Sequence, residues 1–434
     1  MIESSSADIA RRYAAATTAD VAFPIVFKTG SGCTVEDLDG RRYIDFISGY
    51  GVVSTGWQRP EILAAMTAQM QSACFAPPWL PTREALHLAE QLLALGTPSL
   101  QACGRASGGA EANEVALKAH FAHRGGRVLV IGRAYHGGTT RTLALSDAAR
   151  FRMPPSPLPD APRVPPAYCY RCPFGQTYPG CGLECAAAAE SAVRDDRAIT
   201  GVLLEPIIGS GGAIVPPQPY FDAIQDICRR HDLTLIVDEV LTGCGRTGTF
   251  LASEGFDLHP QAISLAKGLG AGYVPVGAAL LDGDLTAALA RYEDVSASLA
   301  WTPLACAAAL ANLRLLRDEE LPERAKDMGA KLLAALRELF ERLLPAHTGD
   351  VRGKGLLIGV ELVKDQATKE PAPRLAKRLT MRCLRGGLMI GTSWDWHTLI
   401  VMPPLVLDDA TMNAALDVLE SALKRLVRGA AIQA

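Results

Sequence analysis

The stretch LTLIVDEVLTGCGRTGTFLASEGFDLHPQAISLAK, residues 233–267, decides the fold. Its first segment is apolar on both faces and ends in the acids Asp238 and Glu239. A glycine-broken loop follows, and a second apolar segment ends in Lys267. A short segment that is apolar on both faces indicates a buried strand of a parallel sheet. Because open α/β sheets bind ligands at the carboxyl ends of their strands, we expect Asp238 and Lys267 to meet across a pocket.

A lysine and an acid in this arrangement have a specific chemical use. Lysine forms Schiff bases with carbonyl compounds, and pyridoxal phosphate (PLP) needs one lysine and one partner for its pyridinium nitrogen. Lys267 and Asp238 offer that pair. A strand-end acid and an unrelated surface lysine are the alternative, and these two residues alone do not decide between the interpretations.

Strands and helices alternate through the middle of the chain. Helical patterns such as 113–125 and 219–232 lie between some of the strand-like segments. This alternation predicts an α/β protein with a doubly wound, mostly parallel sheet. The strand-like segments are 127–132, 201–207, 233–240, 262–268 and 276–282.

The two ends of the chain have a different pattern. Asp39-Gly40 is a hairpin turn signal near the N-terminus, and long helical patterns with a few short apolar segments begin at Pro303. We expect these ends to pack together as a smaller α+β domain. The predicted division is an N-terminal arm with part of the small domain at 1–55, a large PLP-binding domain at 56–305 and a C-terminal small domain at 306–434.

Composition excludes several classes of protein. The chain has 434 residues, 49% of them apolar and 21% charged, which is ordinary for a soluble globular protein. A net charge of −3 provides no argument for binding nucleic acid or an anionic membrane. No stretch is long and apolar enough to span a bilayer, and the polar N-terminus does not resemble a signal peptide. Eleven cysteines, an odd number in a large chain, indicate reduced thiols and a cytoplasmic protein.

A glycine-rich loop precedes a predicted helix at SGGAEANE, residues 107–114. A helix N-terminus presents unpaired N–H groups and the positive end of the helix dipole, which suits a phosphate. We assign the amides of Gly109 and Ala110 to the phosphate, with help from Ser107. An ordinary capped helix is the alternative.

Two further polar positions follow predicted strands. Tyr135, after 127–132, can stack on a pyridine ring, although it can equally be a packing tyrosine. We interpret His136 beside it as structural. Glu205, at the end of 201–207, can orient a neighbour or pair with a base, and a solvated acid is the alternative.

Five motifs follow one another along the chain, namely SGGAEANE, YHGG, EPI-x-G-x-GG, DEV-x-TG-x-GRTG and Lys267. In this order they resemble class III aminotransferases, which are PLP enzymes of fold type I. The resemblance implies that Lys267 holds the cofactor as a Schiff base and that Asp238 contacts its ring nitrogen. It also implies that Val240 and Tyr135 pack on the two ring faces. Ser298 falls where the family has a threonine that reaches the phosphate of the neighbouring subunit, which implies a homodimer with shared active sites.

Within the family, the chain resembles amine and ω-amino acid transaminases, dialkylglycine decarboxylases and aminolactam racemases. Two usual carboxylate clamps are missing, because Ile400 and Gly138 stand where relatives carry arginine. Leu241 replaces a glutamine of the 4-aminobutyrate enzymes, and Tyr50 replaces a glutamine of the decarboxylases. Ser210 stands near the place where racemases carry a second acid.

The substrate pocket is expected to include Ser210 and several aromatic side chains. The aromatic side chains can line a largely apolar pocket, and packing in the core or an interface is the alternative. They are Tyr50, Trp57, Trp79, Trp394 and Trp396. Arg83 or Lys354 can supply a replacement carboxylate clamp.

Four cysteines lie close together in the insert AYCYRCPFGQTYPGCGLECA, residues 167–186. Two close pairs of thiols can bind zinc. The prolines and the uneven second pair argue against zinc, so we predict a surface or interface feature and no metal.

We therefore predict an aminotransferase. It is expected to move an amino group from an amine or ω-amino acid donor to a 2-oxo acid or other carbonyl acceptor by a ping-pong mechanism. An amino-acid racemase or epimerase of the same fold is the alternative enzyme. A non-catalytic protein with a PLP-enzyme fold is a further alternative, and the intact Lys267 and Asp238 argue against it.

Overall fold

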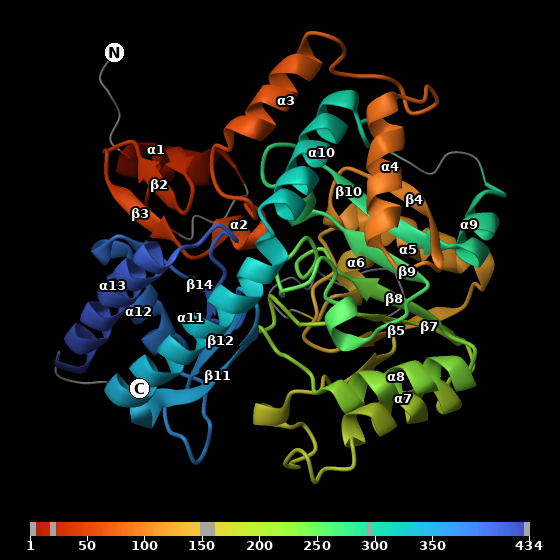
Figure 1. Cartoon of the computed structure of the whole chain (residues 1–434). Helices are drawn as coiled ribbons and strands as arrows, with labels where there is room; N and C mark the ends of the chain where they lie inside the picture. Colours follow the sequence, from red (N-terminus) through yellow and green to blue (C-terminus); the bar gives the residue numbers. More distant parts are fainter. Residues whose placement is uncertain (1–5, 18–22, 148–160, 293–296, 429–434) are drawn as a thin grey trace.

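A seven-stranded sheet forms the centre of the computed structural model, which describes residues 6–17, 23–147, 161–292 and 297–428 (Figure 1). The strand order is β4-β10-β9-β8-β7-β5-β6. The strands are β4 (Leu100–Ala106), β5 (Arg127–Ile131), β6 (Arg163–Val164), β7 (Ile199–Leu204), β8 (Thr234–Asp238), β9 (Ala262–Leu265) and β10 (Gly277–Asp282).

The predicted α/β fold with a mostly parallel sheet is confirmed. Strands β6, β5, β7, β8 and β9 pair in parallel, whereas β10 is antiparallel to both β9 and β4. Parallel strands need a crossover of a dozen or more residues, and the short connection from β9 to β10 is not long enough. Sequence patterns did not predict β4, because its central residues are only partly buried and are not a continuous apolar run.

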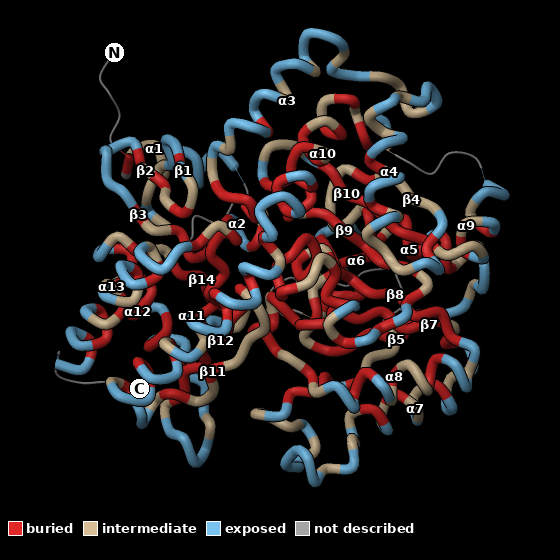
Figure 2. The backbone as a smooth tube through the Cα atoms, viewed as in Figure 1, coloured by how far each residue is buried: buried red, intermediate tan, exposed pale blue. Residues whose placement is uncertain are grey.

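Helices cover both faces of this sheet, so its strands are buried on both sides (Figure 2). Val128, Val130 and Ile236 pack in a core with helix α5 (Gly109–His123). Leu129, Leu235 and Val237 point the other way, into a core with α7 (Glu184–Asp195) and α8 (Gln218–Arg230). Alternate side chains of each strand therefore enter opposite cores, as expected for segments apolar on both faces. Two short helices, α6 (Thr140–Leu145) and α9 (Gly283–Leu289), also contact α5.

A second region combines both ends of the chain, on the left of Figure 1. Three N-terminal strands and β13 (Leu388–Met389) form one sheet, and the predicted hairpin turn at Asp39-Gly40 joins β2 to β3. The other sheet has the order β11-β12-β15-β14 and packs with long helices. The elements are β1 (Phe27–Ser31), β2 (Thr34–Asp37), β3 (Arg42–Asp45), β11 (Thr348–Lys354), β12 (Leu357–Leu362), β14 (Gly391–Thr392), β15 (Thr398–Val401), α1 (Ser6–Ala16), α11 (Leu321–Leu343), α12 (Pro373–Gly386) and α13 (Asp409–Arg428).

Helix α10 (Pro303–Asp318) links the two regions. It crosses the predicted boundary at 305/306 and packs against α3 (Pro60–Met70) and α4 (Arg83–Leu95). A short kinked segment, α2 (Ser48–Gly51), lies near the start of the large region. The domain division stays a prediction. Within the described residues, no helix is long and apolar enough to cross a membrane.

The parallel strands bring several predicted residues to one edge of the sheet. Asp238 is the last residue of β8, and Glu205 directly follows β7. Tyr135 follows β5, and Lys267 begins a single helical turn after β9. Because neighbouring parallel strands end at the same edge, these side chains converge there.

Candidate active site

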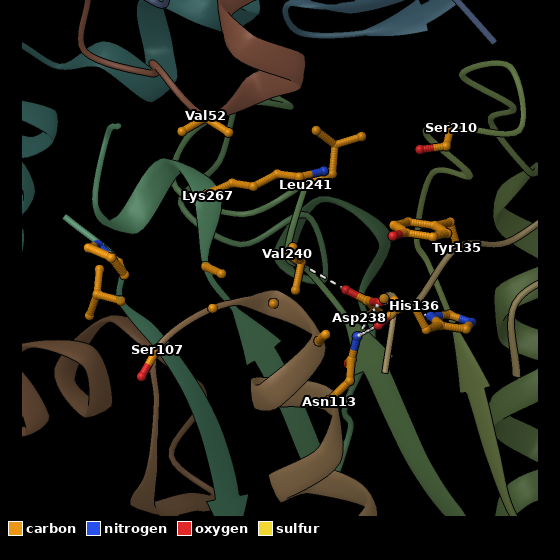
Figure 3. A pocket seen from close by; sticks show the side chains of 18 of the residues that line it. Val52, Ser107, Asn113, Tyr135, His136, Ser210, Asp238, Val240, Leu241 and Lys267 are labelled. Carbon is orange, nitrogen blue, oxygen red and sulfur yellow. Dashed lines mark hydrogen bonds and ion pairs between the residues drawn. The ribbon is translucent and has the colours of Figure 1, made fainter. Parts of the chain in front are cut away.

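A pocket opens at this edge of the sheet (Figure 3). The structure brings together most of the predicted cofactor residues and one predicted substrate residue in its lining. In Figure 3, Val52, Leu241 and Ser210 lie on one side of the Lys267 side chain, and Asn113, Asp238 and Ser107 lie on the other. The predicted residues in the lining are Ser107, Gly109, Ala110, Tyr135, Glu205, Ser210, Asp238, Val240 and Lys267.

The N-terminus of α5 is suited to an anion. Gly108 is the capping residue, and no side chain caps the first turn. The amides of Gly109 and Ala110 are therefore available for a phosphate. A Cβ added at Gly109 would lie 2.6 Å from Cγ1 of Val240, so only glycine lets the helix start this close to the strand-end loop.

Asp238 is buried but well supplied with hydrogen-bond donors. Nδ2 of Asn113 donates to its Oδ2 at 2.7 Å, and Nδ1 of His136 lies 2.8 Å from the same oxygen. The amide of Val240 donates to Oδ1 at 3.0 Å. Burial alone would raise the pKa of Asp238, but its hydrogen bond and charge interaction with His136 lower it below the ordinary value. Asp238 is thus an anion at neutral pH, as a partner of a pyridinium nitrogen must be.

His136 and Asn113 are site residues that the sequence reasoning missed. His136 is 1% exposed, lines the pocket and contacts Asp238 through Nδ1. Asn113 also donates to the carbonyl of His136 at 2.8 Å, and its Oδ1 accepts from Ser264. Their positions in the sequence could have identified them. His136 follows Tyr135 at a strand end, and Asn113 lies one turn after the glycine-rich loop.

Lys267 is half-buried in the pocket lining, and desolvation of its amine lowers its pKa. The nearby Glu205 and Asp238 oppose this shift without cancelling it. A larger fraction of its amine is therefore neutral than for an exposed lysine. A neutral amine is the form that can attack a carbonyl carbon or accept a proton.

Glu205 is buried, not a solvated strand-end acid. Its Oε1 accepts from the amide of Tyr135 at 2.8 Å, and its Oε2 accepts from the amide of Gly209 at 2.9 Å. Burial and the charge of Asp238 raise the pKa of Glu205 to about 7. Glu205 therefore fixes the backbone at Tyr135 and at Gly209. This agrees with the interpretation that its carboxylate orients a neighbouring residue.

The other predicted site residues are not in the lining of this pocket. The Trp57 indole donates to Asp45 at 2.9 Å and packs against Phe27, and the Tyr50 hydroxyl donates to the Thr392 carbonyl at 3.3 Å. Trp79 is 77% exposed, Arg83 is an exposed residue of the first turn of α4, and Ser298 lies in an exposed turn. Aromatic composition does not specify position, because long-range packing decides where such side chains go.

The proposed replacement clamps are also elsewhere. Arg83 is outside the pocket lining, and Nζ of Lys354 donates to the Gly255 carbonyl at 2.9 Å and lies over the Phe256 ring. Gly138 and Leu241 do line the pocket. Lys267 is the one basic lysine or arginine side chain among the described lining residues.

The cysteine insert is a separate feature. Cys169, Cys172, Cys181 and Cys185 line a small cavity away from Lys267, and all four are free thiols. Among the residues that the structure describes, no group of three or more His, Cys, Asp or Glu side chains is placed to hold a metal ion.

Changing Asp238 to Asn tests the importance of its charge. Asp238→Asn keeps the size of the side chain but removes the negative charge, so we expect PLP still to bind while the rate of the amine half-reaction falls by ~100-fold or more. The measurement is stopped-flow absorbance of the bound cofactor. Glu239→Gln is the matched control, because Glu239 is also buried but bonds to the Ala252 and Ser253 amides outside the pocket. It should lower the thermal midpoint and keep turnover, and an unchanged rate in Asp238→Asn would show that another group contacts the ring nitrogen.

Known proteins resemble the whole chain. The model of the aminotransferase class-III family matches residues 15–423. An uncharacterized aminotransferase, YhxA of Bacillus subtilis, is 35% identical over 418 residues, which cover 90% of this chain and 89% of that protein. A leucine/methionine racemase of Thermococcus litoralis is 33% identical over 416 residues, covering 94% and 92%. The PLP-bound structure of an amine transaminase from an uncultivated Pseudomonas species has a TM-score of 0.88 at 30% identity, covering 92% and 95%.

The site and the PLP-bound amine transaminase agree on one cofactor. An uncapped helix end for a phosphate, a buried anion and a lysine with a lowered pKa fit PLP in one pocket. The chain belongs to the class III aminotransferases, and it is an aminotransferase that depends on pyridoxal phosphate.

Proposed function

We propose that the amino donor is an amine or an ω-amino acid, and that the acceptor is a 2-oxo acid or another carbonyl compound. One observation carries this proposal, namely that Lys267 is the one lysine or arginine among the described lining residues. An α-carboxylate beside the reacting amine needs a cation to bind it. Ile400, where the resemblance to the family led us to look for an arginine, is 1% exposed in β15 and packs in the apolar core.

We assign the cofactor contacts residue by residue. The amides of Gly109 and Ala110, with Ser107, hold the phosphate, and Asp238 pairs with the ring nitrogen. Tyr135 and Val240 cover the two ring faces. PLP, when bound, delocalises the electrons left on the substrate carbon when a proton leaves it. The anionic Asp238 favours the protonated ring, which is the better electron acceptor.

Lys267 is the residue that moves the proton. An amine with a lowered pKa can take a proton from the substrate carbon and return it elsewhere on the same face. Racemisation would need a second acid on the opposite face. The two acids in the pocket are both engaged, Asp238 with Asn113 and His136 and Glu205 with two backbone amides. Ser210 is a weak proton donor, so these contacts favour transamination.

We infer that the chain works as a homodimer with shared active sites. Exposed apolar side chains gather on α3, on the following loop and at the start of α4, and monomers rarely expose large apolar areas. Nη1 of Arg105, at the end of β4, donates to the carbonyl of Pro78 and ties this loop to the strand that leads to Ser107. The exposed side chains are Leu63, Met70, Phe75, Trp79, Leu80, Leu86 and, on a nearby turn segment, Leu299.

In this dimer, Ser298 of one subunit would reach the phosphate of the other, and Trp79 and Arg83 would contribute to the interface. We also propose a cytoplasmic location, because all eleven cysteines are free thiols. The division of the chain at 55/56 and 305/306 belongs to the same proposal.

Replacing the lysine tests its assignment. Lys267→Ala should lose the visible absorption of bound cofactor and lower turnover by ~100-fold or more, because general acid–base catalysis alone contributes that much. Lys354→Ala is the control, since it removes a partly buried lysine outside the pocket lining. Turnover in Lys267→Ala within about tenfold of the unchanged enzyme would mean that another group performs the proton transfer.

The holoenzyme itself can distinguish transamination from racemisation. Without acceptor, an amine or ω-amino acid donor should convert the visible band of the bound cofactor into a pyridoxamine band, and added pyruvate or 2-oxoglutarate should reverse the change. Absorbance spectra and chiral chromatography provide the measurement. An unchanged spectrum, with one enantiomer of an amino acid turning into its mirror image, would establish a racemase instead.

A charge on the exposed apolar surface should separate the subunits. Leu80→Asp changes a side chain that is 56% exposed, so it should fold but shift the protein from dimer to monomer and weaken cofactor binding. Val427→Asp is the matched control, because Val427 is 48% exposed on α13. Light scattering after size-exclusion chromatography gives the mass, and a dimer in both variants would place the interface elsewhere.

A further inference from the structure

The pocket wall that contains Ser210 is held from behind through three consecutive carbonyl groups. The Trp394 amide donates to the Ser210 carbonyl at 3.0 Å. Nε and Nη2 of Arg133 donate to the Gly211 carbonyl at 3.2 and 2.8 Å. Nε and Nη2 of Arg352 donate to the Gly212 carbonyl at 3.1 and 2.7 Å. Two guanidinium groups therefore lie directly behind a wall of the substrate pocket.

Several contacts other than an ion pair hold Arg133 in place. Its guanidinium lies over the Trp394 ring, 5.0 Å from the centroid, and over the Tyr168 ring at 5.4 Å. Its own amide donates to Asp147 at 2.9 Å. A Cβ added at Gly211 would lie 2.5 Å from the Arg133 carbonyl oxygen, so the two backbones touch. These contacts hold the positive charge close to Ser210.

Asp395 cancels this charge. It forms an ion pair with Nη2 of Arg133, and the two side chains are 17% and 21% exposed. Asp395 belongs to the turn between β14 and β15, and Ser393 of the same turn donates to its Oδ1. The pKa of Asp395 lies below its usual range, because hydrogen bonding to His397 and the charge of Arg133 outweigh its burial.

The surrounding charges balance. Arg352 pairs with Glu361 at 2.7 Å and with Asp350 at 3.0 Å, and Arg171 also pairs with Glu361. His397 lies between Asp395 and Glu361, at 3.1 and 3.5 Å. With Arg133 and Asp395, three arginines face three acids, so these six side chains are formally neutral. Burial would lower the pKa of His397, but its hydrogen bonds to Asp395 and Glu361 raise it, so a protonated His397 adds one positive charge to the network.

We propose that Asp395 determines donor specificity by neutralising Arg133, a cation fixed behind the Ser210 wall. Once His397 has lost its proton, the wall is neutral, and the pocket prefers donors whose far end carries no carboxylate. This rests on the proposed amine-donor function and names the residue that sets the preference. Asp395 acts through Arg133 and Ser210, so it is a positioning and specificity residue.

The test compares two donors that differ only in charge, an ω-amino acid of four or five carbons and its primary amide. Asp395→Asn removes the acid, while the Gly211 carbonyl and two rings keep Arg133 in place. We expect the ratio of kcat/KM for the acid to kcat/KM for the amide to rise at least about threefold, and added salt to shrink the rise. Assays use the holoenzyme over a pH series that extends to alkaline pH, because the raised pKa of His397 keeps an extra positive charge in the network until His397 loses its proton. The ratio of dissociation constants from calorimetry should move in the same direction.

Control variants distinguish a change in charge from a structural disturbance of the Ser210 wall. Asp395→Asn combined with Arg133→Gln should restore the original ratio, because no cation then remains behind Ser210. Asp232→Asn, which neutralises an acid paired with Arg124 on the surface, changes the net charge equally and should leave the ratio unchanged. Asp395→Ser is a second neutral variant if the asparagine does not fold.

Each other outcome is decisive. If Asp395→Asn lowers kcat/KM for both donors equally, Asp395 is only structural and the inference is wrong. If the unchanged enzyme neither binds nor converts either donor, the proposed donor class itself is wrong, and this inference falls with it.

Discussion

A buried carboxylate at the end of a parallel strand is the constraint on which the rest of the site depends. An ionised acid is very unfavourable inside a protein unless donors surround it. Asp238 is 3% exposed and receives Asn113, His136 and Val240 as partners. These partners come from α5, from the segment after β5 and from the loop after β8, so the sheet and its first covering helix must pack correctly before Asp238 can remain charged.

The need to satisfy buried polar groups also explains how the pocket walls are built. Glu205 joins the amides of Tyr135 and Gly209, which lie after two different strands. Gly109 allows α5 to approach Val240 at a distance that no side chain would tolerate. Buried polar groups thus fix the loops that form the walls, which gives Lys267 a stable environment and leaves room for a ligand between the walls.

Buried charges elsewhere are kept near neutrality. Arg133, Arg171 and Arg352 face Asp350, Glu361 and Asp395 behind the Ser210 wall, where the large region meets β11, β12 and the turn before β15. Partial burial makes these pairs less screened than surface pairs, so neutralising one acid has a larger effect on the pocket. The network thus connects the packing of the two regions to the electrostatics of the substrate site.

The sequence by itself determined the strands, because a run that is apolar on both faces can be buried only inside a covered sheet. It also predicted that polar residues at strand ends would meet in one pocket, since Asp238 and Glu205 lie at the ends of such runs and Tyr135 and Lys267 lie shortly after others. Only the tertiary structure decided the direction of β10, the partners of Asp238 and the positions of Trp57 and Trp79. Arg133 and Asp395 meet although 262 residues separate them in the chain. Contacts of this kind depend on the packing of distant segments, which no local pattern of residues records.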